Sequence, residues 1–378
     1  TDNNISVGMC GSIHSYPVPE KKENYSFYVP DVFSSTPECI PESIELFQDI
    51  NLKLSRNSAR NVDSSIPIKD GLRLLSKVNT IGLTPSTLMA IGGQLVQERL
   101  KPERTTRRRT YQSVLSFDVF FKLLKKEKPD FVTYFTNHVA SSQHRYWAAL
   151  FPDEYEDLKY DQKWINTYDN EILFTMGESD KMLRKLAKFV DKNPEYKLMI
   201  TSSMGQNAVE CEPLETQLYI TDHDKFIKML GVNADEYEKL PAMLPQSNYQ
   251  INTGKADIFN SNMKNLKING SELSYRETGN GRFSIDTGHE NLKTVEILLN
   301  GNIIDFDLSG LENVEIEDKS NCTAYHIPEG HLFIYHPSFK ESKQNETQVP
   351  TCEIMPTILS NFGVKVPDYG ASAIDTIL

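Results

Sequence analysis

The chain has 378 residues, of which 39% are hydrophobic and 24% are charged, which is enough for one large hydrophobic core or two smaller ones. The formal net charge of −12 argues against duplex nucleic acid as a partner, because neutralising its phosphates requires a basic face. No run of about 18 apolar residues occurs, so the sequence predicts no membrane span.

The N-terminal part of the chain alternates short apolar runs with helical patterns. Residues 5–9 are apolar and lead into Cys10-Gly11-Ser12, which is typical of a buried strand entering a loop. Residues 131–136 form a continuous apolar and aromatic run, as in a parallel strand that is buried on both faces. Between these two runs, apolar periodicity predicts helices over residues 41–54, 68–79, 85–99 and 107–127.

The next stretch repeats this alternation. A helix through Trp147 and a long helical region over 161–192 lead to a second apolar strand at 197–201. Strands alternating with helices at this spacing predict an α/β fold with a doubly wound, mainly parallel sheet flanked by helices. Residues 1–249 are the first part of this predicted core.

The pattern changes near residue 250. Short alternating segments are now separated by pairs such as Asn269-Gly270 and Asn300-Gly301, which favour the positive φ angles of hairpin turns. Residues 250–323 are therefore expected to form a small antiparallel β insertion. The apolar run 331–335 is expected to return to the main sheet, so that residues 324–378 complete the α/β core.

The cysteines of the chain indicate its compartment. The five are scattered, odd in number and form no Cys-x-x-Cys pair. This argues against a disulfide framework and a thiolate zinc site, and it favours a reducing compartment such as the cytoplasm. Because Thr1 is not an initiator methionine, the sequence leaves open whether a targeting segment precedes it.

Polar residues follow three of the predicted strands, at 10–14, 136–138 and 202–206. A fourth polar cluster, at 326–331, leads into the last strand. In an open α/β sheet, ligands bind beyond the carboxyl ends of the strands, so these clusters can converge on one crevice. Any single cluster can equally consist of caps and turns.

Four segments stand in the order and rough spacing of one known family. They are Glu353-Ile354-Met355-Pro356-Thr357-Ile358-Leu359 with Gly363 and Pro367; His326 with Pro328-Glu329-Gly330; the stretch 135–147 ending Gln143-His144-Arg145-Tyr146-Trp147; and Ser202-Ser203-Met204-Gly205. Together they resemble the alkaline phosphatase superfamily, in its type I phosphodiesterase and nucleotide pyrophosphatase branch. The resemblance implies chemistry on phosphate or sulfate esters, with His144 and His326 as catalytic or metal-binding residues.

The sequence departs from that family at the metal ligands. The family holds two metal ions, usually zinc, with Asp and His ligands around a Thr or Ser nucleophile. Here Ala140 stands where an Asp should precede His144, and Ser203 and Met204 stand where an Asp-His pair should be. These side chains replace a carboxylate or an imidazole poorly, so no two-zinc site is expected, and at most one divalent metal on His144 and His326 remains. The family's nucleophile segment has no counterpart in these residues and is expected, if the protein has one, upstream of Thr1.

The other candidates each leave two interpretations open. Asn137, His138, Arg145 and Ser203 are substrate-binding residues at the predicted crevice, or they are caps and structural groups. His14 is a further candidate for substrate binding and could also pair with Cys10 as a Cys/His nucleophile, although their spacing on a loop fixes no geometry.

Two groups of basic residues also allow two interpretations each. The first is either an anion contact or a solvated helix start, and it consists of Arg104, Arg107, Arg108 and Arg109. The second is either an anion patch or a helix end with cations against its dipole, and it consists of Arg56, Asn57 and Arg60.

Two classes of function remain. The first is an enzyme that hydrolyses or transfers phosphate or sulfate esters with an altered or lost two-metal site, in which a metal or His and Arg side chains stabilise the developing oxyanion. The second is a non-catalytic relative that binds a phosphorylated sugar, a nucleotide or a protein partner in the retained crevice. The enzyme interpretation is preferred, with an anionic small molecule as the expected partner, although fold alone does not choose between the two.

Overall fold

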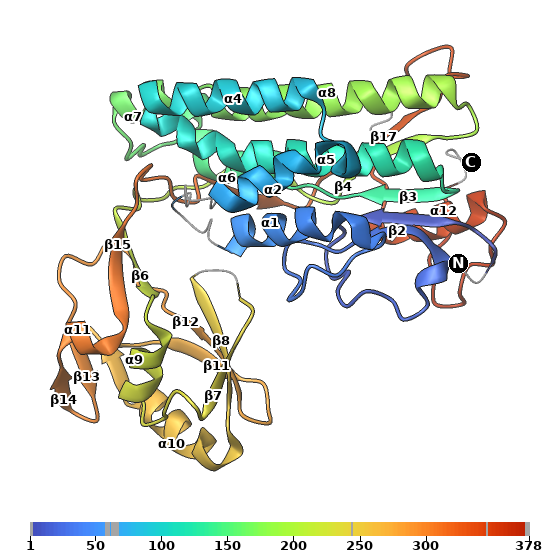
Figure 1. Cartoon of the computed structure of the whole chain (residues 1–378). Helices are drawn as coiled ribbons and strands as arrows, with labels where there is room; N and C mark the ends of the chain where they lie inside the picture. The colour runs from blue at the N-terminus through green and yellow to red at the C-terminus, as the bar shows by residue number, and fades with distance from the viewer. Residues whose placement is uncertain (1–2, 57–60, 62–67, 243–244, 345–346, 375–378) are drawn as a thin grey trace.

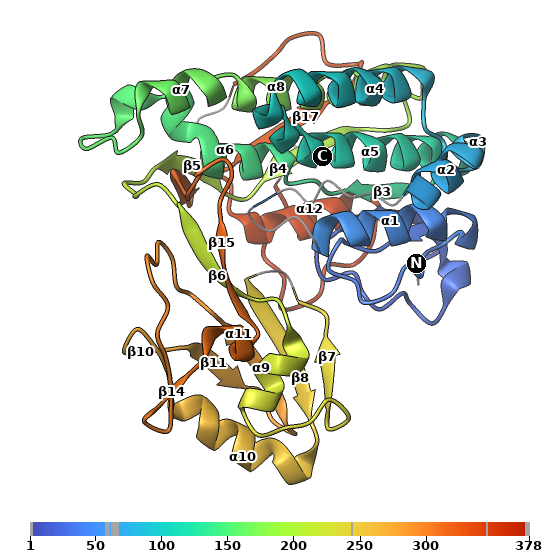
Figure 2. The ribbon, with the colours of Figure 1, turned by 60° about the vertical axis from the view of Figure 1, so that its left-hand side comes forward.

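The computed structural model describes residues 3–56, 61, 68–242, 245–344 and 347–374. The chain forms two bodies, which are seen one above the other in Figure 1 and from another side in Figure 2. The upper one, called the α/β body, contains both termini of the described chain. The lower lobe extends from β6 (Thr216–Ile220) to β15 (Leu311–Glu315), and these two antiparallel strands connect it to the α/β body.

Three parallel strands form the first sheet of the α/β body. β1 (Val7–Cys10) lies between β2 (Tyr25–Val29) and β3 (Phe131–Tyr134). The apolar run at 131–136 is therefore part of a parallel strand pair, as its composition predicted. Gly8 is needed in β1, because a Cβ atom there would lie 2.5 Å from the ring of Phe27 in β2.

Helices cover this sheet. The two longest, α5 (Arg108–Glu127) and α8 (Glu171–Lys192), share one buried apolar cluster with β1 and β2 through side chains such as Phe117 and Phe189. The other helices of the α/β body are α1 (Glu45–Arg56), α2 (Ile68–Ser76), α3 (Val78–Ile81), α4 (Pro85–Leu100), α6 (His138–Leu150), α7 (Gln162–Tyr168) and α12 (Ile354–Asn361). Its 3-10 helices are η1 (Lys22–Asn24), η2 (Glu42–Ile44), η3 (Pro102–Arg107), η4 (Pro152–Glu154) and η5 (Thr351–Glu353). Within the described ranges, no helix has both the length and the apolar character needed to cross a bilayer.

Two strand pairs complete the α/β body. β4 (Leu198–Ser202) pairs antiparallel with β17 (His331–Tyr335), and β5 (Gly205–Ala208) pairs antiparallel with β16 (Ala324–Ile327). Residues 331–335 thus lie in the α/β body, but they were expected in the main sheet and instead pair with β4 in a separate two-stranded sheet. Gly330 permits this pairing, because a Cβ atom there would lie 1.7 Å from the carbonyl oxygen of Ser202.

The lower lobe has a core of its own, in which Leu218 packs with Tyr249 and Phe259. Asn269 and Asn300 have positive φ angles at hairpin turns, as predicted. Residue 250, where the β insertion was expected to begin, lies inside a strand of this lobe. One antiparallel sheet consists of β7 (Tyr237–Leu240), β8 (Gln246–Ile251), β11 (Ser274–Glu277) and β12 (Arg282–Asp286), and the other of β9 (Leu266–Ile268), β10 (Ser271–Glu272), β13 (Ile297–Leu299) and β14 (Asn302–Ile304). The helices are α9 (His223–Met229), α10 (Thr253–Lys264) and α11 (Phe306–Ser309).

The prediction of a doubly wound, mainly parallel sheet is wrong. The structure is mixed α/β, but its sheets have two to four strands each and are mostly antiparallel. Within the described residues, parallel pairing is confined to β1 with its two neighbours. The apolar run of β4 was interpreted as a parallel strand like β3, yet β4 pairs antiparallel with β17. An apolar run indicates that a strand is buried on both faces, but it does not determine which strand lies beside it.

Candidate functional site at the mouth of a cavity

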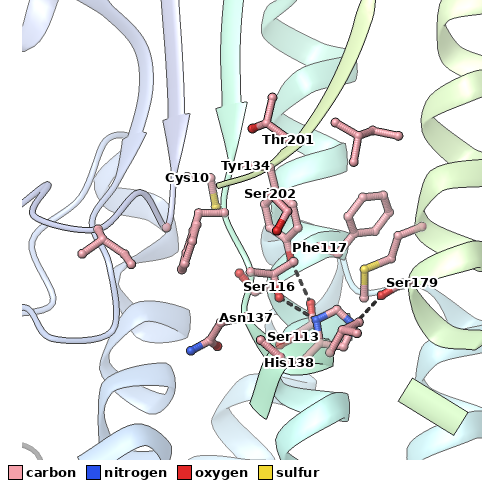
Figure 3. A pocket seen from close by; sticks show the side chains of 18 of the residues that line it. Cys10, Ser113, Ser116, Phe117, Tyr134, Asn137, His138, Ser179, Thr201 and Ser202 are labelled. Atoms are coloured by element: carbon pink, nitrogen blue, oxygen red, sulfur yellow. Dashed lines mark hydrogen bonds between the residues drawn. The ribbon is translucent and has the colours of Figure 1, made fainter. Parts of the chain in front are cut away.

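A cavity of about 1830 Å³ is lined mainly by α5, α6, α8, β3 and β4 of the α/β body (Figure 3), and Pro241 and Ala242 of the lower lobe also contribute. His14 is not one of its lining residues and is exposed in the loop after β1. The other residues expected at a crevice all line the cavity: Asn137, His138, His144, Arg145, Ser203 and His326. We call the region around His144, His326 and Gln206 the mouth.

His144 is held in a defined orientation on α6. Its ring Nδ1 lies 2.6 Å from the carbonyl oxygen of Ala324. Because a carbonyl oxygen only accepts, Nδ1 carries the proton and donates, which leaves Nε2 of the neutral ring as an acceptor. The backbone is fixed as well, since the N–H of Thr323 donates to the carbonyl oxygen of His144 at 2.6 Å.

His326 approaches this ring from β16. It stands directly opposite Gln206 of β5 in the antiparallel register, and opposite residues present their side chains on the same face. The Nε2 atoms of His326 and His144 are 3.2 Å apart, and Nε2 of Gln206 lies 3.3 Å from the same His144 nitrogen. The expected meeting of His144 and His326 is therefore confirmed, and three elements bring their side chains to one point.

Gln206 was missed as a member of this group. It belongs to the polar cluster at 202–206, but only the β5–β16 register reveals that it faces His326. Its Oε1 is buried and has no hydrogen-bond partner in the part of the chain that the structure describes. Leaving a buried carbonyl oxygen unpaired is costly, so this atom favours a ligand or a water molecule that can donate a hydrogen bond.

The mouth keeps His144 neutral at neutral pH. Burial is the largest cause that lowers the pKa of His144, and the neighbouring His326 and Arg145 lower it further. The carbonyl of Ala324 opposes them by accepting from the ring. An anion placed beside Nε2 would favour the protonated ring and raise this pKa.

His138 lies deeper in the cavity and is 4% exposed. Its Nδ1 is 2.7 Å from Oγ1 of Thr136. Its Nε2 is 2.9 Å from Oγ of Ser179 (Figure 3). Burial lowers the pKa of His138 to about 4, so the ring is neutral. With both ring nitrogens engaged by hydroxyl groups, the structural interpretation of His138 is favoured over substrate binding.

Three other candidates, Asn137, Ser203 and Cys10, differ in their exposure. Asn137 and Ser203 are exposed at the cavity and remain available to a ligand. Cys10 is fully buried, and burial raises the pKa of its thiol to about 12. A neutral, buried thiol is a poor nucleophile, which argues against a reactive pair of Cys10 with His14.

A two-metal centre does not fit the mouth. Ala140 lies one turn before His144 on α6, and Ser203 and Met204 are exposed between β4 and β5. In the described portion of the chain, no three His, Cys, Asp or Glu side chains gather as metal ligands. Two imidazole nitrogens 3.2 Å apart could be two ligands of one ion at about 2.0–2.1 Å each, but they cannot hold two ions.

Three of the four arginines in the first basic group bind carboxylates of the protein itself, and the fourth, Arg109, lines the cavity. Arg104 and Arg107 lie 2.6 Å and 2.8 Å from the carboxylate oxygens of Glu171, and Arg108 lies 2.5 Å from Glu98. These arginines are thus internal ion-pair partners. In the second basic group, Asn57 and Arg60 lie outside the described residues.

The comparisons with known proteins add no family to this geometry. No family model matches the chain, and neither does any curated protein or solved structure. The resemblance to the alkaline phosphatase superfamily therefore depends on the quoted sequence segments alone. The function has to be inferred from the mouth itself.

Proposed function

We propose that the mouth binds a phosphate or sulfate ester and hydrolyses it or transfers its phosphoryl or sulfuryl group, with His144 and His326 as an acid–base pair. The observation that supports this is the 3.2 Å separation of their Nε2 atoms beside Oε1 of Gln206, which has no hydrogen-bond partner among the described residues. Two imidazoles at this distance disfavour two positive charges, so the pair carries at most one added proton, which a bound anion stabilises.

The chemistry follows from that single proton. The charge of the protonated pair and of Arg145 attracts the ester anion. One ring donates its proton to the leaving-group oxygen as the bond from that oxygen to phosphorus or sulfur breaks. The other ring takes a proton from the attacking water or acceptor hydroxyl as the new bond forms, so the pair again holds one proton. When water attacks, its second O–H donates a hydrogen bond to Oε1 of Gln206 and keeps its proton.

Binding without turnover is the second candidate function. It is favoured by Ala140, Ser203 and Met204, which stand where the resembled family has metal ligands. The mouth would then hold a phosphorylated sugar, a nucleotide or a phosphorylated group of a protein partner. Both candidates share the same anion contact and differ only in whether the ester is cleaved.

The test combines binding with turnover. Histidine resonances are followed by NMR during titration with inorganic phosphate and sulfate, and p-nitrophenyl phosphate, bis(p-nitrophenyl) phosphate and p-nitrophenyl sulfate are tried as substrates. We expect the anions to shift the resonances of His144 and His326. His144→Gln and His326→Gln should each lower kcat about 10²–10⁴-fold, which is the usual contribution of an acid or base.

The matched control is His289→Gln, because His289 belongs to the lower lobe and should leave both readouts unchanged. Anions that shift neither resonance would refute the proposal. Binding to the mouth without cleavage of any of the three esters would select the second candidate.

We further propose that the protein works in a reducing compartment such as the cytoplasm. This is supported by its five cysteines, all of which lie within the described residues and form no disulfide. Differential alkylation of the protein in intact cells should find thiols at Cys211 and Cys352, which are accessible to reagents. Oxidation of most copies at these positions would contradict it.

A further inference from the structure

Two strand edges border the cavity. In the described part of the chain, β3 has a partner on one side, β1, and β4 has a partner on one side, β17. Tyr134 of β3 and Thr201 and Ser202 of β4 line the same hollow in Figure 3. The cavity therefore separates the free edges of two sheets.

The set of residues by which a strand lines the cavity indicates whether the edge or a face of its sheet borders the cavity. Successive side chains of a strand point to opposite faces, so a face presents every second residue and an edge presents all of them. All five residues of β4 line the cavity, as do Phe131, Val132 and Tyr134 of β3. β17 is separated from the cavity by β4, and of its residues only His331 and Ile334 contribute. The backbones of β3 and β4 thus face the cavity along their lengths.

The amide groups of β3 can be assigned to the two sides. The N–H of Phe131 donates to the carbonyl of Ser6 at 3.0 Å, and that of Phe135 donates to the carbonyl of Cys10 at 3.0 Å. Because successive N–H groups along a strand alternate in direction, those of Val132 and Tyr134 point away from β1, toward the cavity. Backbone donors that border such a cavity need an acceptor, which another backbone strand or water can supply.

The other walls of the space between β3 and β4, which we call the slot, are largely apolar, although Ser116 of α5 and Ser179 of α8 also line it. α5 contributes Phe117 and Leu124, and α8 contributes Met182 and Phe189. The phenol of Tyr134 is already satisfied, because it donates to the carbonyl of Ser113 at 3.0 Å. Within the described residues, the backbone groups along the two strand edges therefore have no hydrogen-bond partners on the slot side, and no apolar side chain fills the space between the edges.

We propose that the slot binds an extended apolar peptide segment from outside residues 1–378, which adds as a strand between β3 and β4. A strand with apolar side chains on both faces matches the helices that cover the slot, as in a fully buried central strand. Its backbone supplies partners to both edges at once, which is the basis of strand addition. A hydrocarbon chain would fill the space but leave the amides of Val132 and Tyr134 unpaired, so it fits less well.

The test uses a synthetic peptide with a central Val-Ile-Val-Ile-Val run flanked by lysine pairs, and residue-resolved hydrogen exchange of the whole chain. In the chain alone, the amides of Val132 and Tyr134 should exchange faster than those of Phe131 and Phe135, which are bonded to β1. The peptide should slow exchange at Val132 and Tyr134 about tenfold or more, and leave the other two nearly unchanged. The control is the same peptide N-methylated at alternate residues, which keeps the side chains but loses the donors along one edge.

A variant isolates the backbone contribution. Val132→Pro removes an N–H that points to the slot and not to β1, so the β1–β3 pairing should survive while peptide affinity falls about tenfold. If Val132 and Tyr134 are as protected as Phe131 in the chain alone, the edge is not free and the proposal is overturned. Equal affinity for the N-methylated peptide would overturn it too, because the slot would then accept apolar bulk and not a strand.

Discussion

His144 and His326 are 182 positions apart in the sequence, and their Nε2 atoms lie 3.2 Å from each other. His144 is on a helix and His326 is on a strand, and residues 322–324 connect the two elements. There the N–H of Thr323 donates to the carbonyl oxygen of His144, and the carbonyl of Ala324 accepts from its ring. The pairing is therefore a property of how α6 docks against β16, and its chemical consequences can be measured.

Anion binding at the mouth should strengthen as the pH falls. The pKa of His144 is lowered in the free protein, mainly by burial, and a bound dianion raises it. Binding therefore takes up a proton at pH values between the free and the bound pKa. Sulfate is the suitable ligand, because it stays a dianion throughout, and calorimetry in buffers of different ionisation enthalpy counts the protons. Sulfate affinity that does not change between about pH 7 and pH 5, where histidines titrate, would contradict this prediction.

Acid should destabilise the protein partly through His138. Its pKa falls from an ordinary value of 6.5 to about 4 on folding, so below 6.5 the unfolded state takes up a proton that the folded state does not. Stability is therefore lost as the pH falls from about 6.5 to about 4, by about 3 kcal/mol in total from this group. Urea unfolding at a series of pH values should show a shallower decline for His138→Gln than for the unchanged protein. His331→Gln, at an exposed position, is the control, and an equal effect of both substitutions would refute the assignment.

Loss of Glu171 should be costly. Its carboxylate is 3% exposed and pairs with Arg104 and Arg107, so Glu171→Ala would leave two partly buried guanidinium groups without their shared anion. A loss of about 3–5 kcal/mol in the free energy of unfolding is expected. Asp180→Ala on the same helix removes an exposed pair with Arg184 and should cost less than about 1 kcal/mol. Similar losses for the two variants would show that the buried pair has no special contribution.

Gly330→Ala should disturb the strands that position the mouth. The added Cβ would lie 1.7 Å from the carbonyl oxygen of Ser202, and backbone atoms must move apart to admit it. The cost should be about 1–3 kcal/mol or more, and the resonances of His144 and His326 should shift. Gly254→Ala on α10 is the control, because nothing lies within 4 Å of its Cβ position. That substitution should be neutral or stabilise the protein by about 0.4–1 kcal/mol.

Much of the local structure could be predicted from the sequence. The apolar runs at 5–9, 131–136 and 331–335 contain strands, and the periodic segment near 107–127 contains the long helix α5. Asn269 and Asn300 have the positive φ angles that hairpin turns need. These features depend on residues close together in the chain, where side-chain periodicity and turn conformation are set by local sterics and burial.

Part of the site could be predicted as well. His144 and His326 stood out through the segments that resemble a known family, and the structure brings them together. Gln206 did not stand out, because its place opposite His326 is a matter of strand register. His138 was a candidate for substrate binding, but only the fold reveals that Thr136 and Ser179 occupy both of its ring nitrogens.

Strand partners were decided by the tertiary structure alone. The apolar runs of β3 and β4 are alike and predicted strands of one mainly parallel sheet, yet β3 pairs with β1 and β4 pairs antiparallel with β17. A run of apolar residues indicates a strand, but the residues of β3 and β4 are partly buried or exposed, and any strand with free backbone groups can pair with either edge equally well. Contacts between distant parts of the chain select the strand that pairs with each edge. One example is Gly330, whose missing side chain lets its backbone approach Ser202 closely. For this protein the sequence determined which segments are strands and helices, and the packing of distant segments determined the sheet order and the composition of the mouth.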